Sequence, residues 1–469
     1  MTWGLFAPLS VSAQSVKAPA PTGTSSRKNP GLASPHHLSG QLRFESMQYL
    51  STVPESPDLT RSQLLSVRAQ LQGPVAGSEW LAYGGDFAAG TFFKRGLNQF
   101  VVHELFLNAG FGSDTSLSAG RKKASWSEMD ERWQLGLWQP HFAMDSLRPE
   151  SQGLTGVFLE HRHGRFEILG FATPIFIPTM GPEIREENGS LVSDSRWYRQ
   201  PSSRYDFNNR INSLVYRLDV PEAEKLVGNP GSALRVRWGD RDRGPRVAAA
   251  WGYKPVNELL LKRANFKVVD QDRFDVTVSP DVTYHELVSA DLGYATERVD
   301  VSLSHLADLP REKRPAADWV VQRIDPLSAT SFQMDIRPPR ILSRQVLLQL
   351  GYLKVQGGGI TDITAEGWSD DFNMFDQRVK FTDVLSIGLQ TEITRFKGRP
   401  LTVQWRSLYD RAQKGSLFSA EFTYSPAKEW ALMAGADVLG VEDDSFRPSG
   451  FLNQFRANDR VYGGMTYVF

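Results

Sequence analysis

The chain has 469 residues, and its 53 lysine and arginine residues are matched by 53 aspartate and glutamate residues, so the formal net charge is zero. No overall charge therefore favours nucleic acid or an anionic membrane surface as a partner. Cysteine is absent, which excludes disulfides and thiolate metal sites and suits passage through an oxidising compartment. The length allows two or three ordinary domains or one large closed β-barrel.

The N-terminus has features of a secretory signal peptide. Residues 3–11 form a short apolar run, and Val11-Ser12-Ala13 offers small or compatible residues for a signal-peptidase site. No basic segment precedes this run, as expected if the true start lies upstream of Met1. Residues 1–13 are therefore predicted to be a signal peptide, with an ordinary unstructured terminus as the alternative. Residues 14–39 are rich in Ser, Pro, Ala and Lys, and they predict a disordered periplasmic leader.

From residue 40 onward, apolar and polar residues alternate with the period of two that indicates β-strands. Val67, for example, lies between Ser66 and Arg68. The alternating runs are 65–71, 234–238, 299–303, 346–352, 381–394, 401–410, 417–424 and 430–438. Those near the C-terminus have about ten residues each, the length that a tilted strand needs to cross a bilayer. A soluble β-sandwich also alternates, so periodicity alone leaves both folds open.

Residues 120–140 (GRKKASWSEMDERWQLGLWQP) have a helical rather than an extended pattern. Ser125, followed three residues later by Glu128, fits a capping box. Four apolar residues recur near helical spacing: Trp126, Met129, Trp133 and Leu137. We therefore predict a short amphipathic helix within a loop over residues 123–151.

A second long loop, over residues 178–210, combines aromatic rings with charged groups. Its candidate binding residues are Glu183, Arg185, Trp197, Tyr198 and Tyr205. Aromatic planes beside arginine and glutamate suit carbohydrate stacking and hydroxyl recognition. They equally suit an ordered loop packed on a rim, and Trp197 with Tyr198 would also fit an interfacial aromatic belt.

Signals for metal binding and catalysis are weak. Residues 362–376 and 442–444 are acidic and would suit divalent ions that bridge lipopolysaccharide, but they lack calcium-loop spacing, so solvated loops are the simpler interpretation. His161 and His163 have no carboxylates at ligand spacing, and no serine near His285 completes a nucleophile–base pair. We predict no enzymatic activity, no metal site and no cofactor.

The last strand separates the membrane barrel from the sandwich. In residues 459–469 (DRVYGGMTYVF), Val461, Met465, Tyr467 and Phe469 share one face. A final amphipathic strand that ends on phenylalanine, with an aromatic residue two positions earlier, resembles the C-terminal signal of porin-like outer-membrane β-barrels of Gram-negative bacteria. The resemblance names no subfamily. It implies a bacterial outer-membrane location, with this strand ending at the periplasmic aromatic girdle.

The resemblance implies an all-β fold, a single closed antiparallel transmembrane β-barrel over residues 40–469, with about 18 strands in a range of 16 to 20. Such barrels have short periplasmic turns and long extracellular loops. The long segments expected outside are 123–151, 178–210, 308–317, 356–379 and 440–458. In this assignment, residues 220–231 and 254–272 fall on the periplasmic side, where they are unusually long.

In porins a long loop often folds into the lumen, so residues 123–151 are the predicted constriction. Charges that would face each other across it are Arg121, Lys122 and Lys123 on one side and Glu128, Asp130 and Glu131 on the other. The alternative is that these charges pair with one another and merely solvate the loop. Further candidates for inward-facing lumen residues are Arg235, Arg237, Arg406 and Glu421.

The function expected is a porin-like channel for passive or weakly selective diffusion of small hydrophilic solutes. One alternative is a structural or adhesive barrel plugged by its own loops. Another is a component of an export or envelope complex that docks through the leader and the long turns. Expected partners are outer-membrane lipid, lipopolysaccharide, small solutes and, through Phe469, the barrel-assembly machinery. Nucleic acid is not expected, and the sequence shows no signature of a subunit interface.

Overall fold

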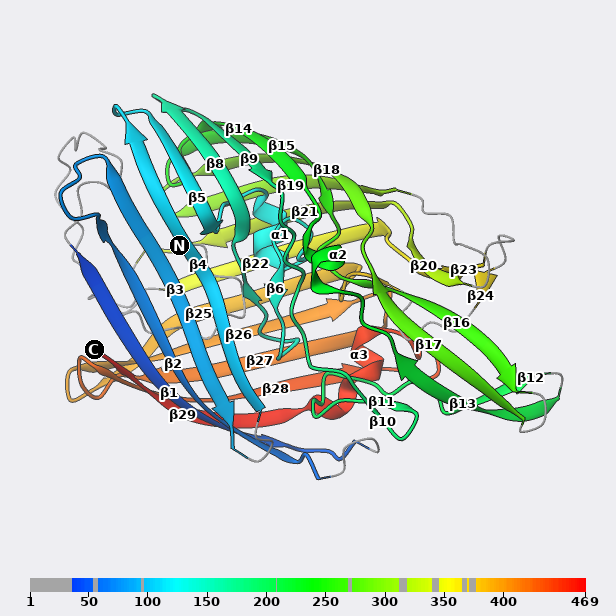
Figure 1. The fold of residues 1–469 in the computed structure, drawn as a ribbon. Coiled ribbons are helices and arrows are strands. Elements are labelled where there is room, and N and C mark those ends of the chain that lie inside the picture. Colours follow the sequence, from blue (N-terminus) through cyan, green and yellow to red (C-terminus); the bar gives the residue numbers. More distant parts are fainter. Residues whose placement is uncertain are drawn as a thin grey trace.

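Eighteen strands form one sheet in which every neighbouring pair is antiparallel, and the sheet closes because β29 pairs with β1 (Figure 1). This computed structural model describes residues 36–53, 58–93, 97–207, 209–268, 272–311, 319–339, 346–364, 369–370 and 377–469. The closed barrel confirms the predicted all-β fold and its central strand number. The predicted signal peptide (1–13) and most of the predicted leader (14–39) lie outside the described residues, and β1 begins within the end of that leader, at His37.

The barrel strands follow one another around the ring in chain order. They are β1 (His37–Tyr49), β2 (Arg61–Pro74), β3 (Leu81–Phe92), β4 (Leu97–Phe111), β5 (Thr115–Lys122), β8 (Leu154–His163), β9 (Phe166–Thr173), β14 (Gly231–Gly239), β15 (Gly244–Pro255), β18 (Tyr284–Ala295), β19 (Val299–Pro310), β21 (Leu327–Ile336), β22 (Val346–Gly357), β25 (Asp383–Phe396), β26 (Arg399–Asp410), β27 (Gly415–Tyr424), β28 (Trp430–Val441) and β29 (Arg460–Val468). Neighbours in sequence are thus neighbours in space, which is the simplest way to close a sheet.

The two ends of the barrel differ in their connections. β1 begins and β29 ends at the same end, where the backbone N–H of Gly40 donates to the carbonyl of Phe469 at 2.9 Å. We call this the terminal end and the opposite one the loop end. Most turns at the terminal end are short, and the longest is the nine-residue connection between β21 and β22. In the turn between β25 and β26, Lys397 and Gly398 have φ of 50° and 75°, the left-handed pair that matches the twist of a tight hairpin. The long segments predicted outside all connect strands at the loop end.

The placement of residues 220–231 and 254–272 on the periplasmic side is wrong. They belong to the connections between β9 and β14 and between β15 and β18, both at the loop end. That placement requires a barrel strand between residues 210 and 220, but the strand found there is β13 (Arg210–Leu218), which is grouped with β16 (Leu260–Val268) and β17 (Arg273–Asp281). In the structure, they pair with each other in a separate sheet. Alternation predicts that a segment is a strand, but it does not predict which strand it pairs with.

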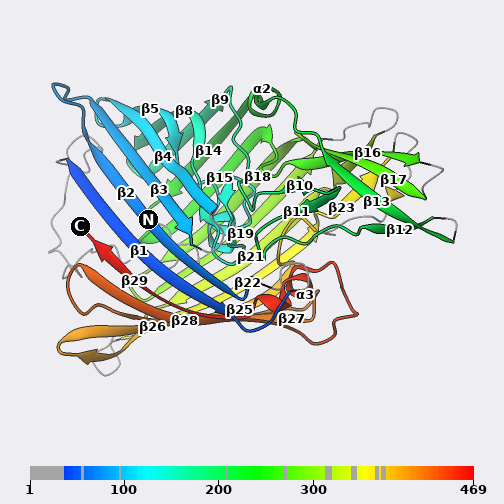
Figure 2. The same ribbon diagram turned by 60° about the horizontal axis from the view of Figure 1, so that its bottom comes forward.

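The second sheet projects beyond the loop end of the barrel (Figures 1 and 2). Its order is β12-β13-β17-β16-β20-β23-β24, with β13 and β17 parallel. The remaining members are β12 (Arg204–Phe207), β20 (Val320–Ile324), β23 (Ile360–Ile363) and β24 (Ser369–Asp370). The smaller elements of the loops are α1 (Glu128–Trp133), β6 (His141–Phe142), β7 (Glu150–Ser151), β10 (Arg185–Glu187), β11 (Ser190–Val192), α2 (Ala223–Val227), α3 (Phe451–Gln454) and η2 (Arg456–Asn458).

The wall of the barrel exposes its apolar side chains outward. Ile387, Phe422 and Leu432 are 41%, 46% and 44% exposed, whereas Arg235 and Asp437 are buried on the inside. A soluble sandwich would bury the apolar set, so the outer surface is one that meets lipid. No helix among the described residues is long and apolar enough to span a membrane. This wall, in a closed 18-stranded antiparallel barrel, places the chain in a bacterial outer membrane.

The helix predicted from residues 120–140 forms, but its cap differs from the prediction. Ser127, not Ser125, caps α1, because the Ser127 hydroxyl accepts a hydrogen bond from the backbone N–H of Asp130. The hydroxyl of Ser125 accepts instead from the Arg241 guanidinium at 2.5 Å. Two serines satisfy the sequence motif, and a tertiary partner decides which of them starts the helix.

Candidate functional site in the barrel lumen

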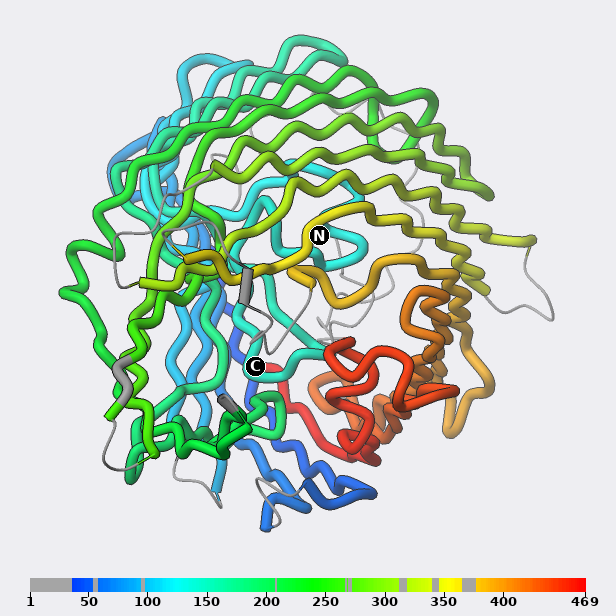
Figure 3. Tube along the Cα trace, turned by 90° about the vertical axis from the view of Figure 1, so that its right-hand side faces the viewer, coloured from blue at the N-terminus to red at the C-terminus, as the bar shows by residue number. Residues whose placement is uncertain are grey.

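Residues 123–153, which we call the lumen loop, leave β5 and fold inside the ring of strands (Figure 3). Aromatic packing holds the start of this loop. Trp126 stacks on Trp138 with ring centroids 5.3 Å apart, and Phe171 of β9 meets Trp126 edge-on at 6.2 Å. Trp126 and Trp138 are each only 1% exposed. These rings therefore seat the loop against the wall of the barrel.

The helix of the lumen loop, α1, lies against strands β21, β22 and β26. Arg132 forms a bidentate ion pair with Asp335 of β21, in which the longer contact is 3.0 Å. The ring of Trp133 packs close to Gly351 of β22, and the Arg406 guanidinium of β26 lies 5.3 Å from the Trp133 centroid. A bulky residue at 351 would collide with that ring. The α1 end of the loop is thus fixed by both charge and shape.

Residues 141–153, the returning limb of the same loop, bind strands near both ends of the chain. Arg148 donates to Glu45 of β1 at 2.9 Å and to Asp437 of β28 at 3.0 Å. Asp145 accepts from Arg460 of β29 at 2.7 Å. All of these groups are buried or nearly so. Buried charges are stable only when they are paired, so removing one partner would strand the others.

Further along the returning limb, Glu150 binds two other strands. It lies 3.3 Å from the Arg68 guanidinium of β2 and 3.2 Å from the ring Nε2 of His103 on β4. Arg68 in turn makes a bidentate pair with Asp86 of β3, at 2.7 and 2.6 Å. The lumen loop is therefore tethered to strands on both sides of the seam where the barrel closes.

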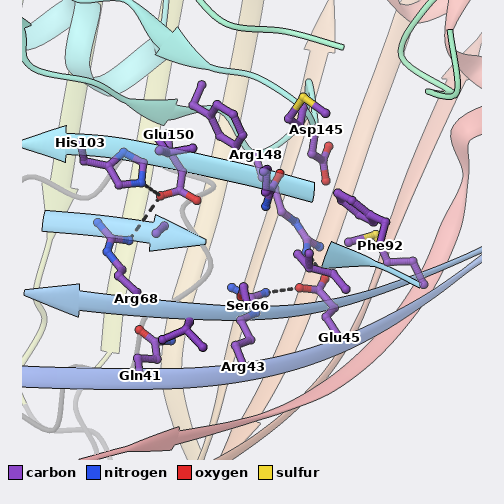
Figure 4. A pocket seen from close by; sticks show the side chains of 18 residues that line it. Gln41, Arg43, Glu45, Ser66, Arg68, Phe92, His103, Asp145, Arg148 and Glu150 are labelled. Atoms are coloured by element: carbon purple, nitrogen blue, oxygen red, sulfur yellow. Dashed lines mark hydrogen bonds and ion pairs between the residues drawn. The ribbon is translucent and has the colours of Figure 1, made fainter. Parts of the chain in front are cut away.

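A partly open cavity of about 170 Å³ remains between the returning limb and strands β1 to β4. Figure 4 shows its side chains pointing toward one another from the wall and from the loop. The polar groups that line it are Gln41, Arg43, Glu45, Ser66, Arg68, Gln99, His103, Asp145, Arg148 and Glu150. The apolar groups include Met47, Leu64, Phe92, Val101, Phe142 and Met144. This cavity combines charged pairs with an apolar flank, and it is our candidate functional site.

The two charge sets predicted for the constriction have other partners. Arg121 donates to the backbone carbonyl of Gly153 at 3.2 Å and also to the side chain of Gln152. Lys122 pairs with Glu160 at 2.5 Å. The ammonium of Lys123 lies 3.7 Å from Asp86. The predicted cations thus hold the ends of the loop.

On the acidic side of the predicted constriction, each carboxylate has its own contact. Glu128 binds Arg246 of β15 at 2.7 Å, and Glu131 binds Arg241 at 3.1 Å. Asp130 accepts from backbone N–H groups of its own loop. Within the described part of the chain, no ion pair joins the predicted cations to the predicted carboxylates. The charges of the loop therefore bind mainly the wall of the barrel.

The other predicted lumen residues do face inward. Arg235 and Arg237 of β14 both bind Glu167 of β9, Arg237 at 2.6 Å. The carboxylate of Glu421 accepts from the Tyr462 hydroxyl at 3.2 Å. Arg406 donates to the Ser386 hydroxyl at 2.9 Å. Alternation correctly predicted which face these residues share, but not their partners.

Residues 174–230, the mouth loop, dock on the β28–β29 connection and on the connection after β1. Arg196 is 1% exposed. Its guanidinium donates to the carbonyls of Ser51, Leu59 and Ala457 at 2.9, 3.1 and 2.5 Å. A further bond of 3.0 Å reaches the side chain of Asn458. One arginine thus joins the mouth loop to two other loops.

The residues predicted to bind solutes in this loop have mixed positions. Trp197 is buried, and its ring is stacked with Phe451 at 6.3 Å. Arg185 is paired with Asp194 at 2.9 Å. Tyr198 donates its hydroxyl to the carbonyl of Leu191 at 3.1 Å. Glu183 and Tyr205 are exposed. Packing of the rim explains Trp197 and Tyr198, and these five residues do not form one site.

Burial inside the lumen changes the protonation of several loop groups. Burial raises the pKa of Asp130 to about 6, although the backbone N–H groups of Leu137 and Trp138, at 2.9 and 3.1 Å, oppose the shift. Burial also lowers the pKa of His141 to about 3, which keeps its ring neutral at pH 7. The pKa of Lys380 falls to about 8 for the same reason.

The wall charges that bind the returning limb were largely missed by sequence reasoning. Arg43 and Glu45 lie on the inward face of β1, and Arg68 and Asp86 follow the same parity on the next strands. Parity alone would have placed them inside the barrel. Their pairing with Arg148 and Glu150 could be predicted only from the path of the lumen loop.

No group of three or more histidine, cysteine, aspartate or glutamate residues in the described parts of the chain is arranged to hold a metal ion.

No family model matches the chain, and no curated protein is similar to it. Among solved structures, similarity is found to OccAB4 of Acinetobacter baumannii, with 10% identity over 94% of this chain and 100% of that one and a TM-score of 0.48. OccK11 (OpdR) of Pseudomonas aeruginosa has 10% identity over 92% of this chain and 96% of that one, with a TM-score of 0.44. A Rhodopseudomonas blastica porin mutant gives 9% identity over 92% and 100%, with a TM-score of 0.40. Scores this low support no transfer of function.

Proposed function

We propose that the barrel is a porin-like channel through which small hydrophilic solutes diffuse passively across the outer membrane. The observation that carries the proposal is the lumen loop. It enters the ring of strands, is fixed by ion pairs to β1, β2, β21 and β28, and leaves a cavity of about 170 Å³ with polar lining beside it. A loop held in this way narrows the lumen and fixes its shape.

The charges of the lumen support weak rather than strong selectivity between anions and cations. Arg148 lies between two carboxylates, Glu45 and Asp437, and Arg68 lies between Asp86 and Glu150. Cations and anions are therefore interleaved at contact distance. A passing ion meets local dipoles instead of a region of one sign, so its charge is neither strongly attracted nor strongly repelled.

Single-channel recording of the refolded full-length mature chain in a planar bilayer tests the proposal. Stable open steps are expected, with a reversal potential near zero in a salt gradient. Replacing residues 141–148 by a short Gly/Ser link should raise the conductance, because the returning limb occupies part of the lumen. Shortening the β16–β17 hairpin, which belongs to the sheet outside the barrel, is the matched control and should not change it. A folded barrel that never conducts would refute the proposal.

A plugged structural or adhesive barrel is the second candidate, and one observation favours it. Apolar residues of the lumen loop and of the loop after β28 join one continuous buried cluster inside the barrel, which includes Trp126, Met129, Leu137, Leu452 and Phe455. The mouth loop adds Trp197 to this cluster. Such packing favours a filled lumen. If the barrel has this function, the wild-type protein does not conduct in a planar bilayer and conducts only after its loops are removed.

The export-complex alternative loses the docking sites proposed for it, because residues 220–231 and 254–272 lie at the loop end, away from the terminal end. The leader on which it also relied falls mainly outside the described residues. We propose lipid, lipopolysaccharide and small solutes as the partners of the folded barrel. Recognition by the assembly machinery through Phe469 fits its position at the end of the closing strand, where the ring is 65% exposed.

A further inference from the structure

We infer that the cavity between the lumen loop and strands β1 to β4 binds small zwitterionic solutes with a short apolar side chain, such as a free neutral α-amino acid. The inference rests on the proposed channel function and names the solute class of that same site. It comes from three features of the cavity: its paired charges, its unpartnered polar atoms and its apolar flank.

The charges that line the cavity are equal in number and lie side by side. Arg43 and Glu45, two residues apart on β1, form an ion pair with each other. Glu45 also binds Arg148, while Glu150 binds Arg68 on the far side of the cavity. Figure 4 shows Arg68 and Glu150 on one side and Arg148 and Glu45 on the other. Each cation already has an anion at contact distance.

This arrangement of paired charges favours a solute that carries both charges over a solute that carries one charge or none. A solute with one charge would leave a net charge in the narrow space or would displace one member of an existing pair, and both are unfavourable where water is scarce. A zwitterion brings an ammonium and a carboxylate separated by a distance similar to that within the pairs. It can lie antiparallel to a pair and add no net charge. An uncharged solute gains less, since it offers only neutral hydrogen bonds.

Three residues of the lining each have a polar atom without a hydrogen-bond partner. The Nε of Arg43, the Oε1 of Gln99 and the Nδ1 of His103 are buried and have no such partner among the described residues. All three residues line the cavity. Buried polar atoms are rarely left unsatisfied, so a polar occupant toward which Arg43 and Gln99 turn these atoms would be favourable. The Arg43 donor suits a carboxylate, and the Gln99 acceptor suits an ammonium.

The apolar flank and the volume of the cavity determine the size of the solute and the kind of side chain that it carries. Met47, Leu64, Val101 and Met144 line it next to the charged groups. A volume of about 170 Å³ corresponds to roughly five or six waters of liquid, at about 30 Å³ each. A free amino acid with a small aliphatic side chain fits this space. A disaccharide would need the loop to move.

Liposomes that contain the full-length barrel test the inference. The probes are L-valine as zwitterion, N-acetyl-L-valine as anion and choline as cation, with empty liposomes as the blank. L-valine is expected to enter roughly tenfold faster than either of the others, a ratio that corresponds to about 1.4 kcal/mol. Millimolar L-valine should also reduce the single-channel current in KCl, whereas N-acetyl-L-valine should not.

Two variants connect the preference to the cavity. Arg43→Gln combined with Glu45→Gln keeps the net charge but removes the Arg43–Glu45 and Glu45–Arg148 pairs, while Arg148 retains Asp437, and it should abolish most of the preference for L-valine. Gln99→Leu keeps every charge and should reduce the block by L-valine severalfold. As a control, Glu222→Gln with Lys225→Gln removes an exposed pair, 3.5 Å apart, on the surface near α2 and should change nothing.

The outcomes separate the inference from the proposed function. Permeation of all three probes according to size alone, in a barrel that conducts ions, would overturn the inference and leave the channel function standing. Absence of any conductance in a folded barrel would overturn the channel function. A preference for L-valine that survives both cavity variants would place the recognition elsewhere in the lumen and would also refute the inference.

Discussion

Arg148 of the lumen loop and Glu45 of β1 form an ion pair of 2.9 Å, although 103 residues separate them in the chain. The second arm of the same guanidinium reaches Asp437 of β28 at 3.0 Å. One side chain thus joins the lumen loop to the first strand and to a strand near the last. Both carboxylates are at most 3% exposed at their side chains, and each has a second arginine partner, Arg43 for Glu45 and Arg460 for Asp437, so Arg148 connects two buried ion pairs into one network.

Replacing Arg148 by alanine should release the returning limb of the lumen loop. Removing one partner of a buried pair destabilises by about 3–5 kcal/mol when the other is left unpaired, and this range is the upper limit here because Glu45 keeps Arg43 and Asp437 keeps Arg460. The expected result is a larger and noisier single-channel current, with a lower thermal midpoint of the barrel. Arg204→Ala, at an exposed position outside the barrel, is the control. Unchanged current in Arg148→Ala would show that the limb does not obstruct the path.

Arg196→Ala should detach the mouth loop from the β28–β29 connection. The guanidinium binds three backbone carbonyls and the Asn458 side chain, and alanine at this position removes all four contacts. We expect limited proteolysis of intact vesicles to cut within residues 174–203 at least severalfold faster than in the wild type. The matched control is Arg185→Ala in the same loop, whose ion pairs are at the surface. Equal cleavage rates in the two variants would contradict this role.

The stability of the lumen loop should depend on the protonation of Asp130. Burial raises the pKa of this carboxyl from 3.8 to about 6 in the folded barrel. Its contribution to stability is therefore fully present below the ordinary carboxyl pKa and is lost as the pH rises through about 6. Two pKa units correspond to about 3 kcal/mol, which sets the upper limit of the effect.

The Asp130→Asn variant should remove this part of the pH dependence. The measurement is the thermal midpoint of the refolded barrel at pH 5 and pH 7.5. Wild type is expected to gain more stability on acidification than the variant does. Asp242→Asn, at an exposed turn position, should behave like wild type. If wild type and Asp130→Asn show the same change between the two pH values, the buried carboxyl does not titrate in this range.

Because residues of β25 alternate between the lipid-facing and the lumen-facing side, arginine should affect the stability of the barrel differently at two positions of this strand. Ile387 points outward and is 41% exposed, while Gln390 has the inward parity. Ile387→Arg should destabilise the barrel in lipid by about 2–4 kcal/mol, because a charge near the bilayer midplane is poorly solvated. Gln390→Arg should be tolerated, since its charge enters a wet lumen. Urea titration in lipid vesicles measures both, and a reversed order would invalidate the assigned faces.

Much of the barrel could be predicted from local patterns. Alternation in residues 401–410, 417–424 and 430–438 identified β26, β27 and β28 with their outward faces, since a strand between lipid and water must alternate. The final strand with its terminal Phe469 identified the class. Local patterns did not indicate that β13, β16 and β17 form a sheet outside the barrel, because alternation does not identify the partner of a strand.

The candidate site could be predicted only in part. The lumen loop was located to within two residues at its C-terminal end, from its length and its helical pattern between two strands. Its charges were assigned to one another, whereas the structure pairs them with β3, β8 and β15. Those partners are distant in sequence, so local spacing contains no information about them.

The sequence by itself limited the strand number to a range of 16 to 20, and it determined the fold class, the lipid-facing side of the wall and the position of the lumen loop. Each of these depends on the periodicity of neighbouring residues and on the solvent that each face meets. Only the tertiary structure decided that Arg148 binds Glu45 and that Arg196 fastens the mouth loop. It also decided that a cavity with paired charges remains beside the loop. These features depend on the path of long loops through space, where partners more than a hundred residues apart come into contact.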